Sequence, residues 1–375
     1  MNLAFKQKIK ALLTLFCRNE LQKKRCLIFY NNFFYFMNRK KEAKIVEQDL
    51  FDYETILKHK YFHCDEYYKA NILYGIAPSL KKYAGYHKPI KACIEHGVFF
   101  GKSQIAIESY DSGLPGIINF AEQRKEYLRP ITRKPITSIG PYICYANDYC
   151  SESEIHNYKI KFGKTLLVFP THSAEGVISH FDYDELIRCI EKIKVEHEFR
   201  TVLVCLYYKD IELGRNKLYE KQNYIVVCAG KREDPNFLSR QKSFINIADY
   251  TVSNAVGTHL GYCIALNKPH MLINQHTSYS TDSKMAGSQI AENEDEAIIN
   301  KREVQREFLT YSEIITEQQK KVCDKYWGLT NIKLPDELYD IFDRYDQVYR
   351  KANHKEKLYV REAEVIFGLD SREMR

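Results

Sequence analysis

The chain has 375 residues, of which 45% are hydrophobic and 13% aromatic, and its formal net charge at pH 7 is +7. This apolar content excludes intrinsic disorder, and the length predicts two domains rather than a single core. The positive balance suits anionic ligands or a membrane surface, but it is too mild to predict nucleic acid as a partner.

The first forty residues combine apolar side chains with lysines and arginines in the pattern of a basic amphipathic helix. Such a helix can lie on an anionic membrane surface, or it can pack its apolar face on the protein itself, and the pattern leaves both open. No run approaches the ~20 apolar residues that span a bilayer. The eleven cysteines form no CxxC pair, which favours a reducing, cytoplasmic location.

The first half alternates between helical and strand-like patterns. Residues 41–85 are predicted to be mainly helical, because apolar positions recur at helical spacing. Strand-like runs follow at 88–94, 116–120 and 135–142, with a helix at 122–128. This alternation is typical of an α/β domain. The polar stretch 147–164 has no sustained periodicity and is predicted to hold the domain linker.

The second half is a series of βα units. Strands are predicted at 165–169, 201–206, 224–228, 250–252 and 270–273, with helices through 186–193, 237–247 and 260–266. This spacing is typical of a doubly wound parallel sheet. Beyond residue 278 the chain becomes polar, and helices are expected at 295–308, 311–326 and 335–349, followed by a solvated tail.

These elements predict an α/β fold with two Rossmann-like domains that face a cleft, together with helical N- and C-terminal extensions. The first α/β domain is assigned to residues 1–150 and the second to residues 151–330. Residues 331–375 are assigned to a C-terminal helical extension.

Three polar clusters stand where predicted strands end. They are Glu95-His96-Gly97, Thr171-His172-Ser173 and the segment 253–259. In open parallel sheets the carboxyl ends of the strands meet at a cleft, which is where ligands bind. Each cluster contains a histidine, which can act as a general base on a hydroxyl or donate to a phosphate. A single histidine is more often a structural hydrogen-bonding residue.

Several side chains in these clusters suit a phosphate, because they donate hydrogen bonds without an acidic charge. They are Thr171, Ser173, Ser253, Asn254 and Thr258, and Gly257 would let the backbone approach closely. The alternative for each is a cap or a turn, as in any ordinary βαβ unit.

Other motifs are weak or missing. No HExxH, Walker, GxGxxG or GxSxG pattern occurs, and no metal site is expected. Asp182 and Asp184 have the DxD form of metal-dependent nucleotide-sugar transferases, but they precede an amphipathic helix and fit capping better. The segment 207–209, Tyr-Tyr-Lys, can stack on a base or cover a sheet edge.

Three pieces resemble bacterial two-domain glycosyltransferases of the GT-B type that build cell-surface polysaccharides, including the related glycerophosphate polymerases that use CDP-glycerol. These pieces are Ile94-Glu95-His96-Gly97-Val98 and the segments 166–173 and 248–269. The resemblance implies that His96 is the base on the acceptor hydroxyl, with Glu95 orienting or assisting it. It also implies that the donor is bound by Thr171, His172, Ser173, Ser253, Asn254, Gly257, Thr258 and His259.

The sequence departs from that family at three points. Its common Ser-Ser pair is Ser253-Asn254 here, the arginine that often follows the Pro-Thr turn is His172, and no acidic residue for the donor ribose is evident at 261–263. CMP-, CDP- and UDP-linked donors therefore all stay open, and no further cofactor is expected.

The expected function is metal-independent transfer of a sugar from a nucleotide-activated donor to a hydroxyl of a glycan or glycolipid acceptor, in capsule or lipopolysaccharide synthesis. The expected location is the cytoplasm, with residues 1–40 as the segment for peripheral contact with the inner face of the bacterial membrane. The alternatives are a polyol-phosphate transferase or a nucleotide-sugar epimerase on the same fold, and a non-catalytic scaffold subunit of a polysaccharide assembly complex.

Overall fold

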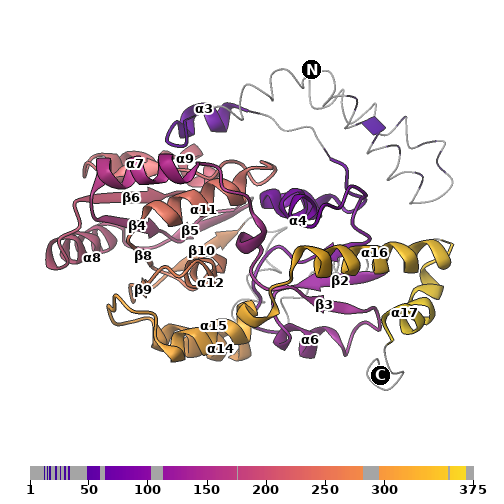
Figure 1. Cartoon of the computed structure of the whole chain (residues 1–375). Helices are drawn as coiled ribbons and strands as arrows, with labels where there is room; N and C mark the ends of the chain where they lie inside the picture. Colours follow the sequence, from indigo (N-terminus) through magenta and orange to yellow (C-terminus); the bar gives the residue numbers. More distant parts are fainter. Residues whose placement is uncertain are drawn as a thin grey trace.

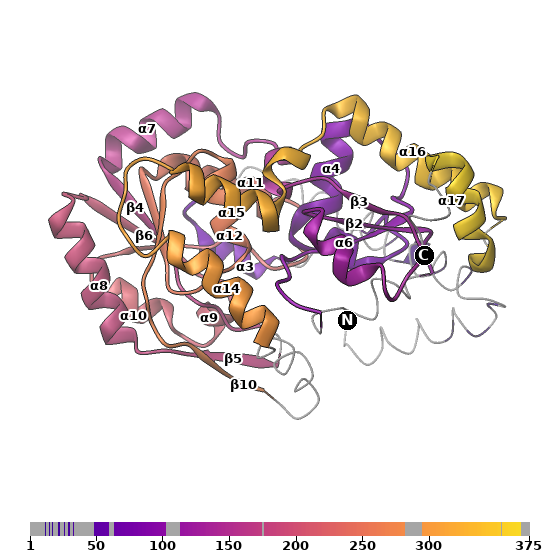
Figure 2. The same cartoon turned by 90° about the horizontal axis from the view of Figure 1, so that it is seen from below.

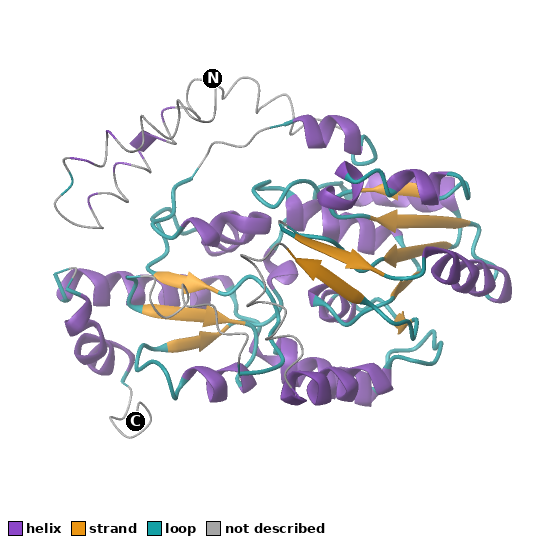
Figure 3. Ribbon diagram, turned by 180° about the vertical axis from the view of Figure 1, so that it is seen from behind, coloured by secondary structure: helices purple, strands orange, loops and turns teal. Residues whose placement is uncertain are grey.

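The computed structural model describes residues 49–59, 64–102, 113–174, 176–281, 295–353 and 355–368, with a few isolated positions between 12 and 33. Two parallel sheets lie side by side, one of three strands and one of five (Figures 1 and 3). The predicted α/β class is therefore confirmed. Most of the predicted amphipathic segment 1–40 lies outside the described residues. Within the described ranges, no helix has the length and apolar character needed to cross a membrane.

The first sheet holds β1 (Ala92–Ile94), β2 (Gly116–Asn119) and β3 (Ile136–Ser138) in that order. Every residue of β1 and β2 is buried, because helices cover both faces. α4 (Ile76–Ala84) and α16 (Pro335–Lys351) lie on one face and α6 (Gln123–Leu128) on the other (Figure 1). Such apolar runs are typical of parallel strands buried on both sides.

The C-terminal helix α16 returns to this first sheet. Its Tyr345 hydroxyl hydrogen-bonds the Thr137 hydroxyl (2.7 Å) and donates to the carbonyl of Ile117 (3.3 Å). A Cβ on Gly116 would overlap the Tyr345 ring, so only glycine permits this approach. α17 (Tyr359–Phe367) packs on α16 through a small apolar cluster, so the prediction of a solvated tail is wrong for residues 355–368.

The second sheet has the order β7-β6-β4-β8-β9 and is parallel throughout. Its strands are β4 (Thr165–Phe169), β6 (Thr201–Cys205), β7 (Ile225–Val227), β8 (Tyr250–Ser253) and β9 (His270–Leu272). Each coincides with a predicted strand within one or two residues. Three predicted helices are confirmed around it: α8 (Tyr183–Glu196), α11 (Phe237–Ile247) and α12 (Thr258–Ala265).

A two-stranded antiparallel ribbon was not predicted from the sequence. It pairs β5 (Val177–His180) with β10 (Ser278–Thr281) and lies at one edge of the second sheet's half (Figure 2). Its strands are short and alternate between exposed positions and positions that are partly buried or, at Ser179, buried. Pairing across about a hundred residues leaves no local signal in either strand.

The polar stretch predicted as a linker contains a helix, α7 (Glu152–Phe162). Ser151 and Glu154 form a capping box at its start, and Phe162 is its one fully buried residue. With so few buried positions, the helix has no periodic apolar face in its sequence, so it was not predicted. The boundaries at 150 and 330 stay a prediction.

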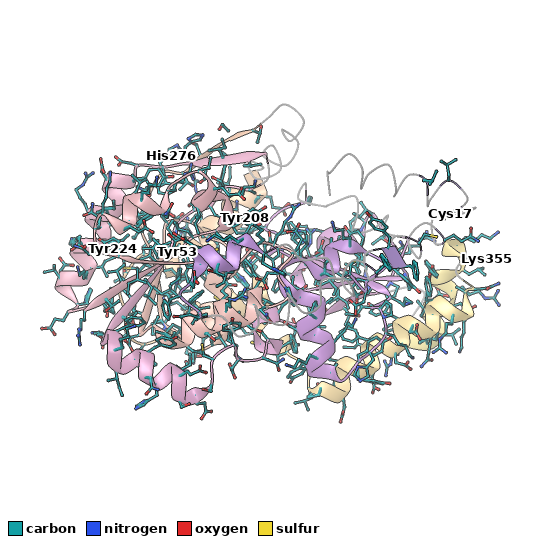
Figure 4. All side chains as sticks on the ribbon, turned by 90° about the horizontal axis from the view of Figure 1, so that it is seen from above. Cys17, Tyr53, Tyr208, Tyr224, His276 and Lys355 are labelled. Atoms are coloured by element: carbon teal, nitrogen blue, oxygen red, sulfur yellow. The ribbon has the colours of Figure 1, made fainter. Side chains whose placement is uncertain are left out.

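The N-terminal helix α3 (Tyr53–Lys58) packs on the second half of the chain. There the hydroxyl of Tyr53, a residue labelled in Figure 4, donates to Glu220 of α10 (Asn216–Glu220) at 2.6 Å. α14 (Asp295–Glu307) is confirmed, and α15 (Glu317–Trp327) begins later than predicted because Thr316 caps it.

Candidate functional site

A pocket of about 550 Å³ lies where the carboxyl ends of strands from both sheets meet. Its wall takes residues that follow β1 in the first sheet and β4, β6, β7 and β8 in the second. Ligands bind at such strand ends in open α/β sheets, and the volume is in the usual range for small-molecule sites.

Six of the ten predicted site residues line this pocket: His96, Thr171, His172, Gly257, Thr258 and His259. His96 and His172 are exposed, so a ligand can reach both imidazoles. Thr258 also joins the two sheets, because its hydroxyl accepts from the backbone N–H of Val98 at 3.3 Å. The other four, Glu95, Ser173, Ser253 and Asn254, are buried and are not in the pocket's described lining.

The buried carboxylate of Glu95 binds Arg124. The guanidinium donates to both carboxylate oxygens, at 2.7 and 2.9 Å, and both side chains are almost inaccessible to solvent. Arg124 also lies over the ring of Phe99, 4.5 Å from its centroid. The partner that the structure gives Glu95 is thus a cation, and its predicted assistance to His96 stays a prediction.

Asn254 ties together the loops that follow β4 and β8. Its side-chain carbonyl accepts from the N–H of Thr171 (2.7 Å) and from its hydroxyl (2.9 Å). Its amide donates to Gln275 (2.8 Å). Asn254 therefore shapes the pocket by orienting Thr171.

Ser173 belongs to a buried ion-pair network behind His172. Its N–H donates to the carboxylate of Asp210, and its hydroxyl accepts from Arg215 at 2.9 Å. Arg215 also donates to Asp210 (2.6 Å) and to the hydroxyl of Ser179 (2.8 Å). Burial raises the pKa of Asp210, although Ser173 and Arg215 oppose this shift. The network fixes the loop that presents His172.

Ser253 forms a hydrogen-bond chain beneath the start of α12. Its hydroxyl donates to the carbonyl of Ala255 (3.0 Å) and lies 3.0 Å from Nε2 of His270. The Thr251 hydroxyl lies 2.8 Å from Nδ1 of the same ring. The Thr251 hydroxyl also donates to the carbonyl of Pro269 (2.9 Å), and burial lowers the pKa of His270 well below the usual value, so the ring is neutral. The chain supports the backbone that leads into α12.

The N-terminus of α12 opens at the pocket. Gly257 precedes the helix without a side-chain cap, so the first N–H groups of the helix are left for a ligand or water. The His259 ring stacks on Phe169 at 4.9 Å, and its buried Nε2 has no hydrogen-bond partner in the described part of the chain. Burial, aided by His172, lowers the pKa of His259 to about 3, so the ring is neutral.

The pocket wall contains two cationic side chains, one of which, Arg232, also pairs with the carboxylate of Glu233 at 3.0 Å. Arg232, in the loop after β7, and Lys301, on α14, are part of its wall. No aspartate or glutamate occurs among its described lining residues. Neither cation was predicted, because one lies in a polar loop and the other on a helix far along the chain.

A row of rings crosses the pocket from one sheet to the other. The centroid distances are 4.9 Å from His172 to Tyr207, 6.4 Å from Tyr207 to Tyr74 and 5.8 Å from Tyr74 to His96. Tyr207 was singled out in the sequence as a residue for stacking or covering, and it lines the pocket. Tyr74 was missed.

Tyr74 has a left-handed backbone, with φ of 58°. This conformation costs a residue other than glycine about 1 to 2 kcal/mol. Its N–H donates to the carbonyl of Arg232 (2.5 Å), and a Cβ on Gly75 (φ 72°) would overlap the carbonyl of Pro235. The backbone of the first half is thus pressed against the loop that carries Arg232.

Metal ligands are not gathered in the described ranges, where no group of three or more histidine, cysteine, aspartate or glutamate side chains could hold an ion. In the DxD sequence, Asp182 caps α8, accepting from the N–H of Glu185 at 3.0 Å. The capping interpretation is confirmed.

No family model matches the chain, and neither does any curated protein. Among solved structures, it is similar to the wall teichoic acid polymerase TagF, with a TM-score of 0.37 and 12% identity over 70% of this chain and 69% of that one. It is also similar to MnaA of S. aureus in complex with UDP, with a TM-score of 0.33 and 10% identity over 75% and 80%. Scores this low describe a loose likeness of fold and carry no functional argument.

Proposed function

We propose that the protein is a nucleotide-sugar-dependent glycosyltransferase of GT-B architecture, in which the pocket between the two sheets holds both donor and acceptor. The observation that carries this proposal is the pocket at the strand ends and the donors that line it. It combines the uncapped N-terminus of α12 with Arg232 and Lys301, and its described lining has no carboxylate. That combination favours an anionic ligand.

The donor phosphates are assigned to the start of α12. Backbone N–H groups there and the hydroxyl of Thr258 donate to phosphate oxygens, while the ring of His259 occupies the space where a Cβ on Gly257 would lie. The rings of Tyr207 and Phe237, both in the lining, offer flat apolar surfaces for the base. Positive charge from Arg232 and Lys301 serves the role that a metal ion has in other transferases.

His96 approaches from the first sheet and is assigned as the general base. The acceptor hydroxyl oxygen forms a bond to the anomeric carbon while the bond from that carbon to the phosphate oxygen breaks. The nucleotide leaves with the electron pair, and the hydroxyl proton passes to the imidazole. Stabilisation of the leaving phosphate by α12 and the two cations is the larger part of the catalysis. A bacterial surface glycan as acceptor follows from the sequence resemblance alone.

Calorimetric titration with CMP, CDP and UDP in the presence of EDTA tests the proposal. We expect at least one nucleotide to bind without metal, and Arg232→Gln to weaken it about tenfold or more, since hydrogen bonds to charged groups are the strong ones. Arg188→Gln is the matched control, because Arg188 is exposed on α8. Absence of binding by any nucleotide would contradict the proposal and favour a scaffold subunit.

The chemistry is tested separately with the nucleotide-sugar whose nucleotide binds. A transferase releases free nucleotide only when an acceptor is supplied, apart from slow hydrolysis. An epimerase converts the donor with no acceptor, and a polyol-phosphate transferase uses the polyol-linked nucleotide instead. Product analysis by mass spectrometry and NMR distinguishes the three.

A further inference from the structure

His172 follows the central strand of the second sheet. In the order β7-β6-β4-β8-β9, β4 lies between β6, which leads to Tyr207, and β8, which leads to α12. The His172 ring contacts that of Tyr207, with 4.9 Å between the centroids. On the other side, the N–H of the preceding Thr171 donates to the side chain of Asn254, which follows β8, at 2.7 Å. His172 therefore lies between the surface assigned to the base and the helix start assigned to the phosphates.

One ring nitrogen of His172 is already bound to the backbone. Its Nδ1 lies 3.1 Å from the carbonyl oxygen of Ser173. Because a carbonyl oxygen only accepts, Nδ1 carries the proton in this contact, and in the neutral ring Nε2 is left with a lone pair. The carbonyl is itself held in place, since the N–H of Ser173 donates to the buried carboxylate of Asp210 and its hydroxyl accepts from Arg215 at 2.9 Å. The backbone thus selects the tautomer in which Nε2 is an acceptor.

The second ring nitrogen, Nε2, is open to the pocket. It has no hydrogen-bond partner in the part of the chain that the structure describes. The side chain is exposed and belongs to the pocket wall, so a ligand can reach this atom. The described lining contains no carboxylate that would compete for a hydrogen-bond donor on the ligand. A ligand hydroxyl at the end of β4 therefore meets an acceptor in Nε2 of His172.

We propose that Nε2 of His172 accepts a hydrogen bond from one of the two ribose hydroxyls of the bound nucleotide, and that the pocket thereby selects ribonucleotides over their deoxy analogues. In a nucleotide the ribose joins the base to the phosphates, and His172 lies between the places assigned to those two groups. A nucleotide without this hydroxyl leaves the acceptor unpaired, which weakens binding. The inference rests on the nucleotide binding of the proposed function and is independent of which group is transferred.

Calorimetric titration of wild type and His172→Phe tests the contact. The ligands are CDP or UDP, whichever binds, its 2′-deoxy and 3′-deoxy analogues, and inorganic pyrophosphate. We expect wild type to bind the ribonucleotide roughly three- to tenfold more tightly than one of the two analogues, the usual effect of one hydrogen bond. Phenylalanine keeps a ring beside Tyr207 but has no acceptor, so His172→Phe should bind the ribonucleotide and that analogue equally. Its affinity for pyrophosphate should equal that of wild type.

The matched control is His156→Phe, on the exposed surface of α7, which should keep the wild-type preference. Should His172→Phe not fold, His172→Ala replaces it, because removal of an exposed side chain leaves no cavity in the core.

The outcomes separate this inference from the proposed function. If wild type binds no nucleotide, the proposed function fails, and the ribose contact with it. If wild type binds the ribonucleotide and both analogues equally, or if the variant keeps the wild-type preference, the ribose contact is overturned and the proposed function stands. An equal loss of affinity for ribonucleotide, analogues and pyrophosphate in the variant would assign His172 to the phosphates and would also overturn the ribose contact.

Discussion

Arg124 forms a two-point ion pair with Glu95, immediately before His96 in the chain. The pair is buried between β1 and the helix α6, and the backbone carbonyl of Glu95 also accepts from the hydroxyl of Tyr142 at 2.8 Å. These contacts fix the end of β1 and so the position from which His96 reaches the pocket. We therefore expect the loss of the Glu95 side chain to lower the stability of the fold.

Glu95→Ala should lower the free energy of unfolding by about 3 to 5 kcal/mol, because it leaves the guanidinium of Arg124 buried without its counter-charge. Urea unfolding followed by circular dichroism measures the change. Glu122→Ala is the matched control: its ion pair with Lys125 (2.7 Å) is exposed and should contribute less than about 1 kcal/mol. Equal losses in the two variants would refute the structural role of Glu95.

His96→Ala should lower kcat by roughly 10²- to 10⁴-fold, the usual effect of losing a general base. Nucleotide release in the presence of acceptor is the assay, and a thermal melt checks that the variant is folded. His156→Ala, on the exposed surface of α7, should turn over normally. A folded His96→Ala protein with near-normal turnover would mean that another group takes the proton.

Gly116→Ala should destabilise the first sheet, since the added methyl would overlap the ring of Tyr345 on α16. Overpacking of this kind typically costs about 1 to 3 kcal/mol, and more where the neighbour cannot move. Gly97→Ala adds the same methyl where the neighbouring ring of Phe99 is 4.0 Å away. The free energy of unfolding of Gly97→Ala should stay within about 0.5 kcal/mol of the wild-type value. A Gly116→Ala protein as stable as wild type would show that Tyr345 and α16 can move away from the sheet to make room for the methyl group.

The stability contributed by Glu66 should depend on pH. Burial raises the pKa of Glu66 to about 7 from 4.5, against the opposing effects of Lys81 (3.1 Å) and the N–H of Ile90 (2.9 Å). A carboxyl group whose folded pKa is raised stabilises the protein fully below pH 4.5 and loses this contribution as pH rises to about 7. The loss is of the order of 3 kcal/mol.

Unfolding free energies at pH 4.5, 5.5, 6.5 and 7.5 test this dependence. Wild type should lose stability relative to Glu66→Gln over that range, because glutamine does not ionise. Glu122→Gln is the control for an exposed carboxylate. Parallel pH profiles for wild type and Glu66→Gln would show that Glu66 is ionised throughout.

The strands of the second sheet could be predicted because each is largely buried and therefore appears in the sequence as a short, mainly apolar run. In β4 five successive residues are buried, and a run of five apolar or β-branched residues in the sequence is the direct result. The helix α7 could not be predicted, because its few buried positions give no apolar period. The β5–β10 ribbon could not be predicted either, because its two strands are far apart in the chain.

Residue type and strand position predicted part of the site. His96, His172 and Thr258 follow strands, and that placement was enough to bring them to the pocket. Ser253 and Asn254 have the right chemistry but point to His270 and Thr171, because a strand's side chains alternate and residue type does not give their direction. Tyr74 and Arg232 carry no such signal, since their positions depend on a left-handed turn and on tertiary contact.

The return of α16 to the first sheet also affects the order in which the two halves can fold during synthesis. β3 ends at Ser138, but the ring that packs on Gly116 arrives with Tyr345, about two hundred residues later. At roughly 5 to 20 residues per second, this delay on the ribosome amounts to about 10 to 40 s. The five-stranded sheet, complete by Leu272, can assemble within that interval, while the three-stranded sheet still lacks the cover that α16 adds beside α4. We therefore expect the half that emerges second to fold first, and the nascent first half to be the part that chaperones must shield.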